Sequence, residues 1–240
     1  MTATEVIWHD LECGGYREDL PLWRTLAREH GDPILEVGAG TGRVSLDLAR
    51  LGHEVTALDR DEELLSELAA RAAGTTLETV HADARSFTLE RRFALCLVPM
   101  QAIQLLGGVE ERAAFLRCAR AHLSPGGVLA TALTGVVEPY EVADGEPAPL
   151  PDIRELDGVV YASRPIAVRE QSDVFVIERR REIVAADGAH EVRENRIALH
   201  RVGAAELERE GRAAGFSELA RAHIPATVDY VGSEVVMLVA

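Results

Sequence analysis

The stretch Leu35-Glu36-Val37-Gly38-Ala39-Gly40-Thr41-Gly42 decides the fold of this chain. The apolar run 33–37 leads into it as a short buried strand, and residues 43–51 leave it with the apolar spacing of a helix. Glycine accepts positive φ and lets a ligand approach the backbone closely, and a helix that begins there offers free N–H groups. A glycine turn between a strand and a helix predicts a ligand-binding α/β fold, although alone it does not choose among nucleotide cofactors.

Strand and helix signals alternate on both sides of this turn. Helices are predicted at 19–30, from Asp61 onward and at 110–123, and strands at 54–58, 77–81, 93–98 and 128–133. Strands that alternate with helices form βαβ units and a parallel sheet. Ligands of such a sheet bind at the carboxyl ends of the strands, near the point where the strand order reverses.

The pattern changes after Thr134. Residues 138–157 are rich in Pro, Gly and acid and are predicted as a loop or hinge. Three β-like segments follow at 159–168, 174–184 and 192–199, with a hairpin turn at 186–188, and then a helix at 204–214 and strands at 218–224 and 234–239. We therefore expect a single domain, 1–240, with an N-terminal cap segment and helix (1–32), a core (33–135), an antiparallel β insertion (136–201) and a C-terminal part (202–240).

Composition excludes several function classes. The 25 basic residues are all Arg, so Schiff-base chemistry on Lys and a P-loop are excluded. The net charge of −15 would repel nucleic acid. Three scattered cysteines predict neither a disulfide framework nor a zinc site, and Cys96 is expected in the core. With no signal peptide or membrane span in view, we expect a cytoplasmic protein.

Three acids at strand ends sharpen the interpretation of the glycine turn. Glu36 would repel a diphosphate and attract an ammonium or sulfonium group, Asp59 can accept hydrogen bonds from both hydroxyls of a ribose, and the pair Asp83-Ala84 can read an adenine edge. Each has a structural alternative: Glu36 as a capping or salt-bridging acid, Asp59 as the cap of the helix near Asp61, and Asp83 as an ordinary turn residue.

Taken in order, these motifs resemble the class I S-adenosylmethionine-dependent methyltransferases. The matching features are E-x-G-x-G-x-G at 36–42, the acid Asp59, the D-A pair at 83–84, the L-x-P-G-G turn at 123–127 and the closing strands in 218–239. The resemblance implies a Rossmann-like, doubly wound, seven-stranded sheet whose last strand is antiparallel, with the β insertion after the fifth strand. It also implies S-adenosyl-L-methionine as the cofactor and S-adenosyl-L-homocysteine as its product.

The resemblance also implies roles for individual residues. The glycine loop would pass under the methionine part of the cofactor, Asp59 would bind the ribose, Arg60 would flank the adenine, and Asp83 with Ala84 would bind the adenine edge. The implied cofactor-binding residues are Glu36, Gly38, Ala39, Gly40, Gly42, Asp59, Arg60, Asp83, Ala84, Pro99 and Met100.

The candidate catalytic residues are His9, Tyr16 and Gln101. The N-terminal segment is expected to precede the first helix and to fold over the cofactor; His9 is either a base or a surface histidine beside Asp10. Gln101 stands where many relatives have Asn, the N-P-P-Y motif of base and glutamine methylases is absent, and the acid frequent after the fifth strand of small-molecule relatives is missing from 131–134. Further acceptor-site candidates are Gln104, Tyr140, Tyr161, Arg164, Arg169 and His200.

The expected function is methyl transfer to N or O of a small-molecule acceptor by in-line displacement, in a monomer or homodimer and without a metal. An amine acceptor needs only to be held neutral and aligned, whereas a hydroxyl needs a base. The insertion resembles the lid hairpins of small-molecule N-methyltransferases and could also be a dimer contact; Arg179-Arg180-Arg181 within it predicts a solvated face or guarded edge, or a site for an acidic partner. The alternatives are a cofactor-binding protein that transfers no methyl group and an NAD(P)-dependent oxidoreductase, which Glu36 and the GxGxG spacing disfavour.

Overall fold

The chain forms two compact units in a computed structural model that describes residues 4–134, 138–143, 149–228 and 230–240. The larger unit comprises residues 16–135 and 202–240, and the smaller unit comprises residues 1–15 and 136–201.

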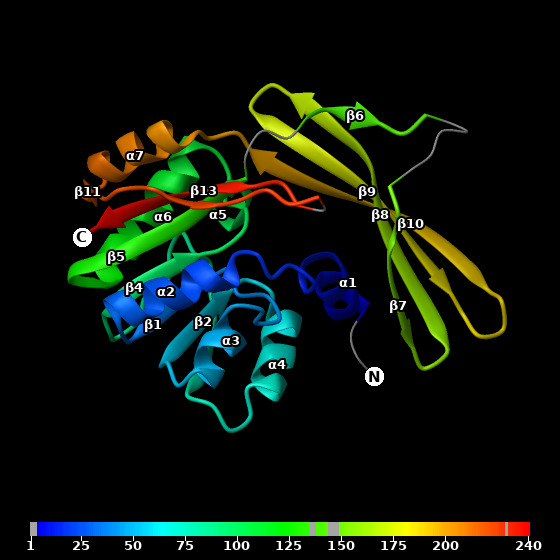
Figure 1. Cartoon of the computed structure of the whole chain (residues 1–240), viewed down its shortest axis with the longest axis horizontal. Coiled ribbons are helices and arrows are strands. Elements are labelled where there is room, and N and C mark those ends of the chain that lie inside the picture. Colours follow the sequence, from blue (N-terminus) through cyan, green and yellow to red (C-terminus); the bar gives the residue numbers. More distant parts are fainter. Residues whose placement is uncertain (1–3, 135–137, 144–148, 229) are drawn as a thin grey trace. The chain divides into compact units, whose positions relative to one another are not determined.

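A mixed sheet forms the centre of the larger unit (Figure 1). Its strand order is β11-β13-β5-β4-β1-β2-β3, with β12 also paired to β13. The bounds are β1 Ile34–Val37, β2 Val55–Asp59, β3 Leu77–His81, β4 Phe93–Val98, β5 Leu123–Thr134, β11 Ser217–Glu218, β12 Ala222–Ile224 and β13 Ser233–Val239. Strands β1 to β5 are parallel and β13 is antiparallel to β5, which confirms the expected Rossmann-like sheet. The sixth strand, predicted as one segment at 218–224, is divided into β11 and β12.

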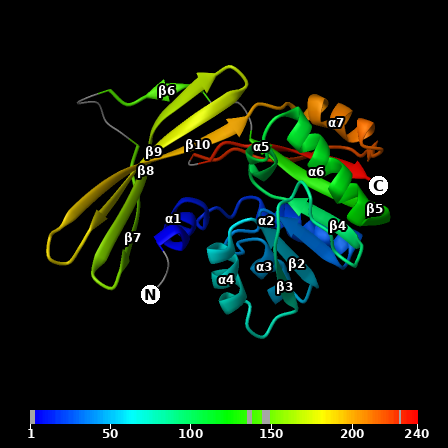
Figure 2. The same ribbon diagram turned by 180° about the vertical axis from the view of Figure 1, so that it is seen from behind.

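Helices cover both faces of this sheet, as Figures 1 and 2 show. On one face lie α2 (Leu20–His30), α3 (Ser45–Arg50) and α4 (Glu62–Arg71); on the other lie α6 (Val109–His122) and α7 (Ala204–Ala213). A short helix, α5 (Ala102–Leu105), follows β4 and was not predicted. Three hydrophobic clusters hold the layers together, one on the face of α6 and α7 and two on the face of α2, α3 and α4.

Local signals explain where these elements begin and end. Asp61 caps α4 by accepting hydrogen bonds from the N–H groups of Glu63 (3.0 Å) and Leu64 (3.1 Å). Gly31 ends α2 with a positive φ. Cys96 is fully buried in β4, and burial raises the pKa of its thiol, which confirms it as a core residue.

The carboxyl ends of the parallel strands meet at one edge of the sheet. The glycine loop follows β1, Asp59 ends β2, Met100 follows β4 and Thr134 ends β5. Because the strand order reverses between β1 and β4, this edge is where a ligand of the sheet is expected.

The smaller unit is an antiparallel sheet with one helix on it. The sheet order is β10-β9-β8-β6, and β7 pairs with β8. The bounds are α1 Thr4–Cys13, β6 Tyr140–Glu141, β7 Asp152–Leu156, β8 Val159–Gln171, β9 Val174–Val184 and β10 His190–His200. The three predicted strands and the turn at 186–188 are confirmed. The prediction of a loop over 138–157 is wrong where β6 and β7 form, because both pair with β8; residues 144–148 of that stretch, like 135–137 beside the predicted insertion boundary, lie outside the described residues.

The N-terminal segment, predicted to precede the first helix, is itself the helix α1. Val6, Ile7 and Trp8 are buried on it, and the Trp8 ring meets the edge of Tyr161 with 5.5 Å between ring centroids. These three apolar residues are adjacent in sequence, so they lack the three-to-four-residue spacing from which a helix is predicted.

The prediction of a solvated arginine face is wrong for two of its three residues. Arg181 donates two hydrogen bonds of 2.8 Å to the Glu12 carboxylate of α1, and Arg179 donates to Ser163 (2.9 Å) and Asp152 (2.8 Å). Arg180 points to the other face and pairs with Glu182. Strand alternation therefore places the outer two arginines inside the unit, where they bind α1.

Candidate functional site

The glycine loop donates its N–H groups to acceptors within the protein. Gly38 and Ala39 donate to the Leu58 carbonyl (2.8 and 3.1 Å), and Gly40 donates to Oδ2 of Asp59 (2.8 Å). A loop that cradles phosphate groups presents such N–H groups to the anion. This loop instead places a carboxylate on one of them, which opposes a diphosphate ligand.

Gly42 is required by packing. Its φ is +90°, and a Cβ there would collide with the side chains of Leu68 and Leu46. The last glycine of the motif therefore serves the close approach of α4 and α3 to the loop.

Asp59 lies half-buried at the end of β2. Its Oδ2 accepts from Gly40 and its Oδ1 from the N–H of Asp61 (2.9 Å). It does not cap α4, since Asp61 does. A carboxylate has about four lone-pair sites, so Asp59 keeps capacity for hydroxyl donors beside the loop.

Glu36 is buried behind the loop, with 2% of its surface exposed. It accepts a hydrogen bond from the Ser45 hydroxyl at the start of α3. Burial raises the pKa of Glu36 to about 8, so its carboxyl group is largely protonated at neutral pH. In this structure Asp59, and not Glu36, is the accessible carboxylate at the loop.

Asp83 is engaged with a neighbouring side chain. Arg85 donates to both of its carboxylate oxygens (2.9 and 2.5 Å), and these hydrogen bonds lower the pKa of Asp83 to about 2. Ala84 is buried, and Arg60 is exposed with its carbonyl oxygen 3.0 Å from Nε2 of His81. The turn-residue interpretation of Asp83 thus has direct structural support.

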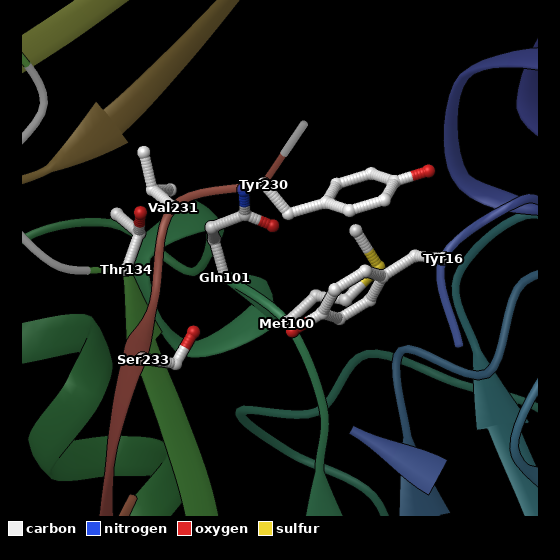
Figure 3. A pocket seen from close by; sticks show the side chains of 7 residues that line it. All are labelled: Tyr16, Met100, Gln101, Thr134, Tyr230, Val231 and Ser233. Atoms are coloured by element: carbon white, nitrogen blue, oxygen red, sulfur yellow. The ribbon is translucent and has the colours of Figure 1, made fainter. Parts of the chain in front are cut away.

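A pocket opens at the carboxyl edge of the same sheet (Figure 3). Its lining comes from the segment before α2, the end of β4, the end of β5 and the loop before β13, all in the larger unit. The lining residues are Tyr16, Met100, Gln101, Thr134, Tyr230, Val231 and Ser233. The structure thus brings two of the three candidate catalytic residues, Tyr16 and Gln101, into one pocket with Met100, while Pro99 is buried just before them.

Two tyrosine rings form one wall of the pocket. The centroids of Tyr16 and Tyr230 lie 4.8 Å apart, with their planes inclined by 57°. Figure 3 shows both rings beside Met100, with the amide of Gln101 between them and Thr134. Met100 has a positive φ of 53°, a conformation that is uncommon outside glycine and clusters at ligand sites.

The polar groups of the pocket are neutral. The Thr134 hydroxyl oxygen is buried without a hydrogen-bond partner among the described residues, while the Thr134 N–H donates to Oε1 of Gln104 (2.9 Å). Burial raises the pKa of Tyr16 to about 12, so its hydroxyl stays protonated near neutrality. None of the seven lining residues is of an acidic or a basic type.

The remaining candidates belong to the smaller unit. His9 is half-buried on α1, and the sheet carries Tyr140, Tyr161, Arg164, Arg169 and His200. Arg169 is bound to Glu141 (2.7 Å), and Arg164 and His200 lie 3.4 and 3.6 Å from the carboxylates of Glu182 and Asp173.

The described ranges contain no group of three or more His, Cys, Asp or Glu side chains that could hold a metal ion. Across those same ranges, no helix combines the length and apolar character needed to cross a membrane.

Sequence reasoning missed Tyr230, Val231 and Ser233. No motif marks them, and residues 218–239 were interpreted only as closing strands. The signal that could have found them is topological: β13 runs antiparallel to β5, so Ser233 pairs with Thr134 at the carboxyl end of β5. The loop that enters β13 must therefore reach the ligand edge.

Sequence comparison with known proteins finds methyltransferases. A family model described as a methyltransferase domain matches residues 34–127. The cypemycin N-terminal methyltransferase of a Streptomyces species is 31% identical over 143 residues, which cover 60% of this chain and about half (56%) of that protein's length.

Solved structures match over nearly the whole chain. A sugar N-methyltransferase from Streptoalloteichus is 19% identical with a TM-score of 0.71, covering 98% of this chain and 93% of that one. An amino pentose methyltransferase from Micromonospora echinaspora, involved in calicheamicin biosynthesis and solved with S-adenosylmethionine bound, is 22% identical with a TM-score of 0.68 and covers 97% and 95% of the two chains. At these identities the likeness shows a common fold.

Proposed function

We propose that the chain is a class I S-adenosylmethionine-dependent methyltransferase and that it transfers a methyl group from S-adenosylmethionine to the nitrogen of a small amine. The observation that carries this proposal is the neutral, aromatic pocket at the carboxyl edge of the sheet, beside the glycine loop. The names of the relatives, which act at an N-terminus, on a sugar or on an amino pentose, support the same acceptor class.

The residues at the loop fit an adenosyl cofactor better than a dinucleotide. Asp59 has lone pairs left for ribose hydroxyls, and the N–H groups that a diphosphate would need are already bonded. When bound, the cofactor supplies an electrophilic methyl group on a sulfonium centre. We propose that residues 38–42 and Asp59 hold it, with Pro99 and Met100 beside its reactive end.

The pocket would orient the amine and exclude water. The Thr134 hydroxyl oxygen, which has no hydrogen-bond partner among the described residues, can accept a hydrogen bond from an N–H group, and the Gln101 amide offers a second polar contact. The tyrosine wall and Met100 cover an apolar side of the acceptor. Alignment at close range supplies much of the acceleration of such a displacement.

None of the seven described residues that line the pocket is a base, and this favours nitrogen over oxygen. A neutral amine attacks through its own lone pair, and the proton it carries is lost to water afterwards. A hydroxyl group must lose its proton at the moment of attack, and neither Tyr16, with a pKa of about 12, nor Gln101 can take it. The net charge of −15 also favours amines over anionic acceptors and nucleic acid, because the chain attracts the ammonium form, which releases a proton to water before the neutral amine attacks.

Paired acceptors test the proposal. Amino sugars and peptides with a free N-terminus are each incubated with the protein and S-adenosylmethionine. Matched analogues in which a hydroxyl replaces the amine are assayed in parallel, and the formation of S-adenosylhomocysteine is measured by mass spectrometry. We expect turnover confined to amines. Turnover of the hydroxyl analogues alone would reassign the acceptor atom, and tight cofactor binding without turnover of any pair would favour a non-methylating member.

A further inference from the structure

A buried ion pair lies directly behind Tyr16. Arg43 donates to both carboxylate oxygens of Asp19, at 2.5 and 2.7 Å. The side chain of Asp19 is fully buried and that of Arg43 is 7% exposed. Nε1 of Trp23 donates a third hydrogen bond, 2.8 Å long, to Asp19.

Arg43 also holds Tyr16 by two separate contacts. Its Nη1 donates to the Tyr16 carbonyl oxygen (3.1 Å), and its guanidinium carbon lies 5.1 Å from the centroid of the Tyr16 ring. Arg43 follows Gly42 directly, so the side chain that fixes Tyr16 comes from the end of the glycine loop. One residue therefore joins the loop to the aromatic wall of the pocket.

We propose that Arg43 and Asp19 are positioning residues, which fix the Tyr16 ring at the acceptor pocket and tie it to the glycine loop. The proposal rests on the proposed function, because the purpose of a fixed Tyr16 is to align an acceptor with the methyl donor. Neither residue lines the pocket, so both act through Tyr16.

Two observations separate this role from simple stabilisation. Gly14 and Gly15 precede Tyr16 and have no side chains that could hold it, so the contacts from Arg43 come from outside this segment. Asp19 and Arg43 lie just before α2 and α3, and these two helices are already joined by the exposed pair Arg24–Asp47, at 2.7 and 2.6 Å. Replacing a buried ion pair by apolar residues often leaves stability unchanged, so the value of the Asp19–Arg43 pair lies in the geometry that it imposes.

The test removes the pair without leaving a lone buried charge. The double variant Asp19→Leu/Arg43→Met is compared with wild type and with Arg24→Met/Asp47→Leu, which removes the exposed pair between α2 and α3. All three proteins carry 3-fluorotyrosine, and with four tyrosines in the chain the Tyr16 resonance is assigned by Tyr16→Phe. Fluorine NMR spectra are recorded with and without S-adenosylhomocysteine, whose affinity is measured by calorimetry.

We expect the Tyr16 resonance of Asp19→Leu/Arg43→Met to move toward that of a solvent-exposed tyrosine, while the Tyr140 and Tyr161 resonances stay in place. The affinity for S-adenosylhomocysteine should stay within about threefold, and kcat on the accepted amine should fall by about 100-fold, the loss typical of misplaced reactants. The control should match wild type in every measurement.

An unchanged Tyr16 resonance in the double variant overturns the proposal, as does an unchanged kcat. If wild type fails to bind S-adenosylhomocysteine, the proposed function falls, whereas the resonance still decides whether the pair holds Tyr16. If circular dichroism shows the double variant to be unfolded, Arg43→Lys replaces it, because lysine keeps the charge and loses the paired donors and the ring contact. A Tyr16 resonance at the wild-type position in Arg43→Lys is then the contradicting result.

Discussion

Among single residues, Asp59 has the most direct predicted effect on cofactor binding. Charge-assisted hydrogen bonds contribute about 1.5–3 kcal/mol each, so Asp59→Ala should weaken S-adenosylhomocysteine binding by at least about tenfold in calorimetry. The matched control is Asp61→Ala, which removes the α4 cap and costs about 1 kcal/mol of stability while leaving the affinity unchanged. Equal binding by Asp59→Ala and wild type would contradict the ribose assignment.

The raised pKa of the buried Glu36 carboxyl group should make the stability of the fold depend on pH. Its pKa is about 8 in the folded chain and about 4.5 in an unfolded one, so between these values the folded chain keeps a proton that the unfolded chain releases. Stability from this group therefore falls as pH rises through that window. The Glu36→Gln variant lacks this loss. Between pH 5 and pH 8, the free energy of unfolding of wild type should therefore fall by at least ~1 kcal/mol more than that of the variant, as measured by urea unfolding. A constant difference between the two proteins would show that Glu36 ionises freely.

For single residues, the sequence predicted the positions of the important acids but not their burial or their hydrogen-bond partners. Glu36, Asp59 and Asp83 all stand where the motif placed them. Their hydrogen-bond partners, however, are Ser45, Gly40 and Arg85. The spacing of a motif does not show whether an acid is buried or which neighbour donates a hydrogen bond to it. The sequence analysis expected Glu36 to attract a cation. Because Glu36 is buried, the carboxylate available at the loop is that of Asp59.

Among the elements, the packing of α4 against the glycine loop depends on Gly42. Gly42→Ala adds a methyl group that collides with Leu68 at a φ of +90°, whereas Gly52→Ala meets a similar φ of +96° with nothing within 4 Å. We expect Gly52→Ala to lose about 1 kcal/mol from backbone strain alone and Gly42→Ala to lose clearly more, by thermal unfolding. Equal losses would mean that the loop relaxes around the added methyl group.

In the smaller unit, α1 is held to the sheet through Glu12. Burial acts to raise the pKa of Glu12, but hydrogen bonds from Arg181 and Ser163 outweigh it and leave the pKa below its ordinary value. Removing one partner of a buried pair costs roughly 3 kcal/mol, so Glu12→Gln should lower the free energy of unfolding by that order. The control is Glu191→Gln in the exposed pair with Arg193, where less than ~0.5 kcal/mol is expected. Equal effects would show that α1 does not depend on this carboxylate.

Helices and strands were predicted correctly where the periodic apolar pattern is long. They were missed where an element forms only through its contacts with another part of the chain. Strands β1 to β5 and helices α2, α4 and α6 lie where the sequence placed them. Helix α1 and strand β7 were missed because the first buries three adjacent apolar residues and the second forms by pairing with β8 in an acid- and proline-rich stretch. Tertiary contacts, and not local propensity, define both.

In the whole molecule, the pocket gathers residues that are far apart in the chain. Tyr16, Met100, Thr134 and Tyr230 meet because the sheet brings its carboxyl edge and the start of β13 together. The sequence predicted the edge through the glycine loop and predicted Tyr16, Met100 and Gln101 as candidates. It could not predict Tyr230 or the Asp19–Arg43 pair, since neither belongs to a motif and both arise from the packing of distant segments.

The central claim is that this edge binds an adenosyl cofactor and not a dinucleotide, and calorimetry on the intact chain tests it most directly. S-adenosylhomocysteine and NADH are titrated separately into the same protein preparation. We expect saturable binding of S-adenosylhomocysteine at one site and no heat of binding for NADH; binding of NADH with none of S-adenosylhomocysteine would contradict an adenosyl site at this edge.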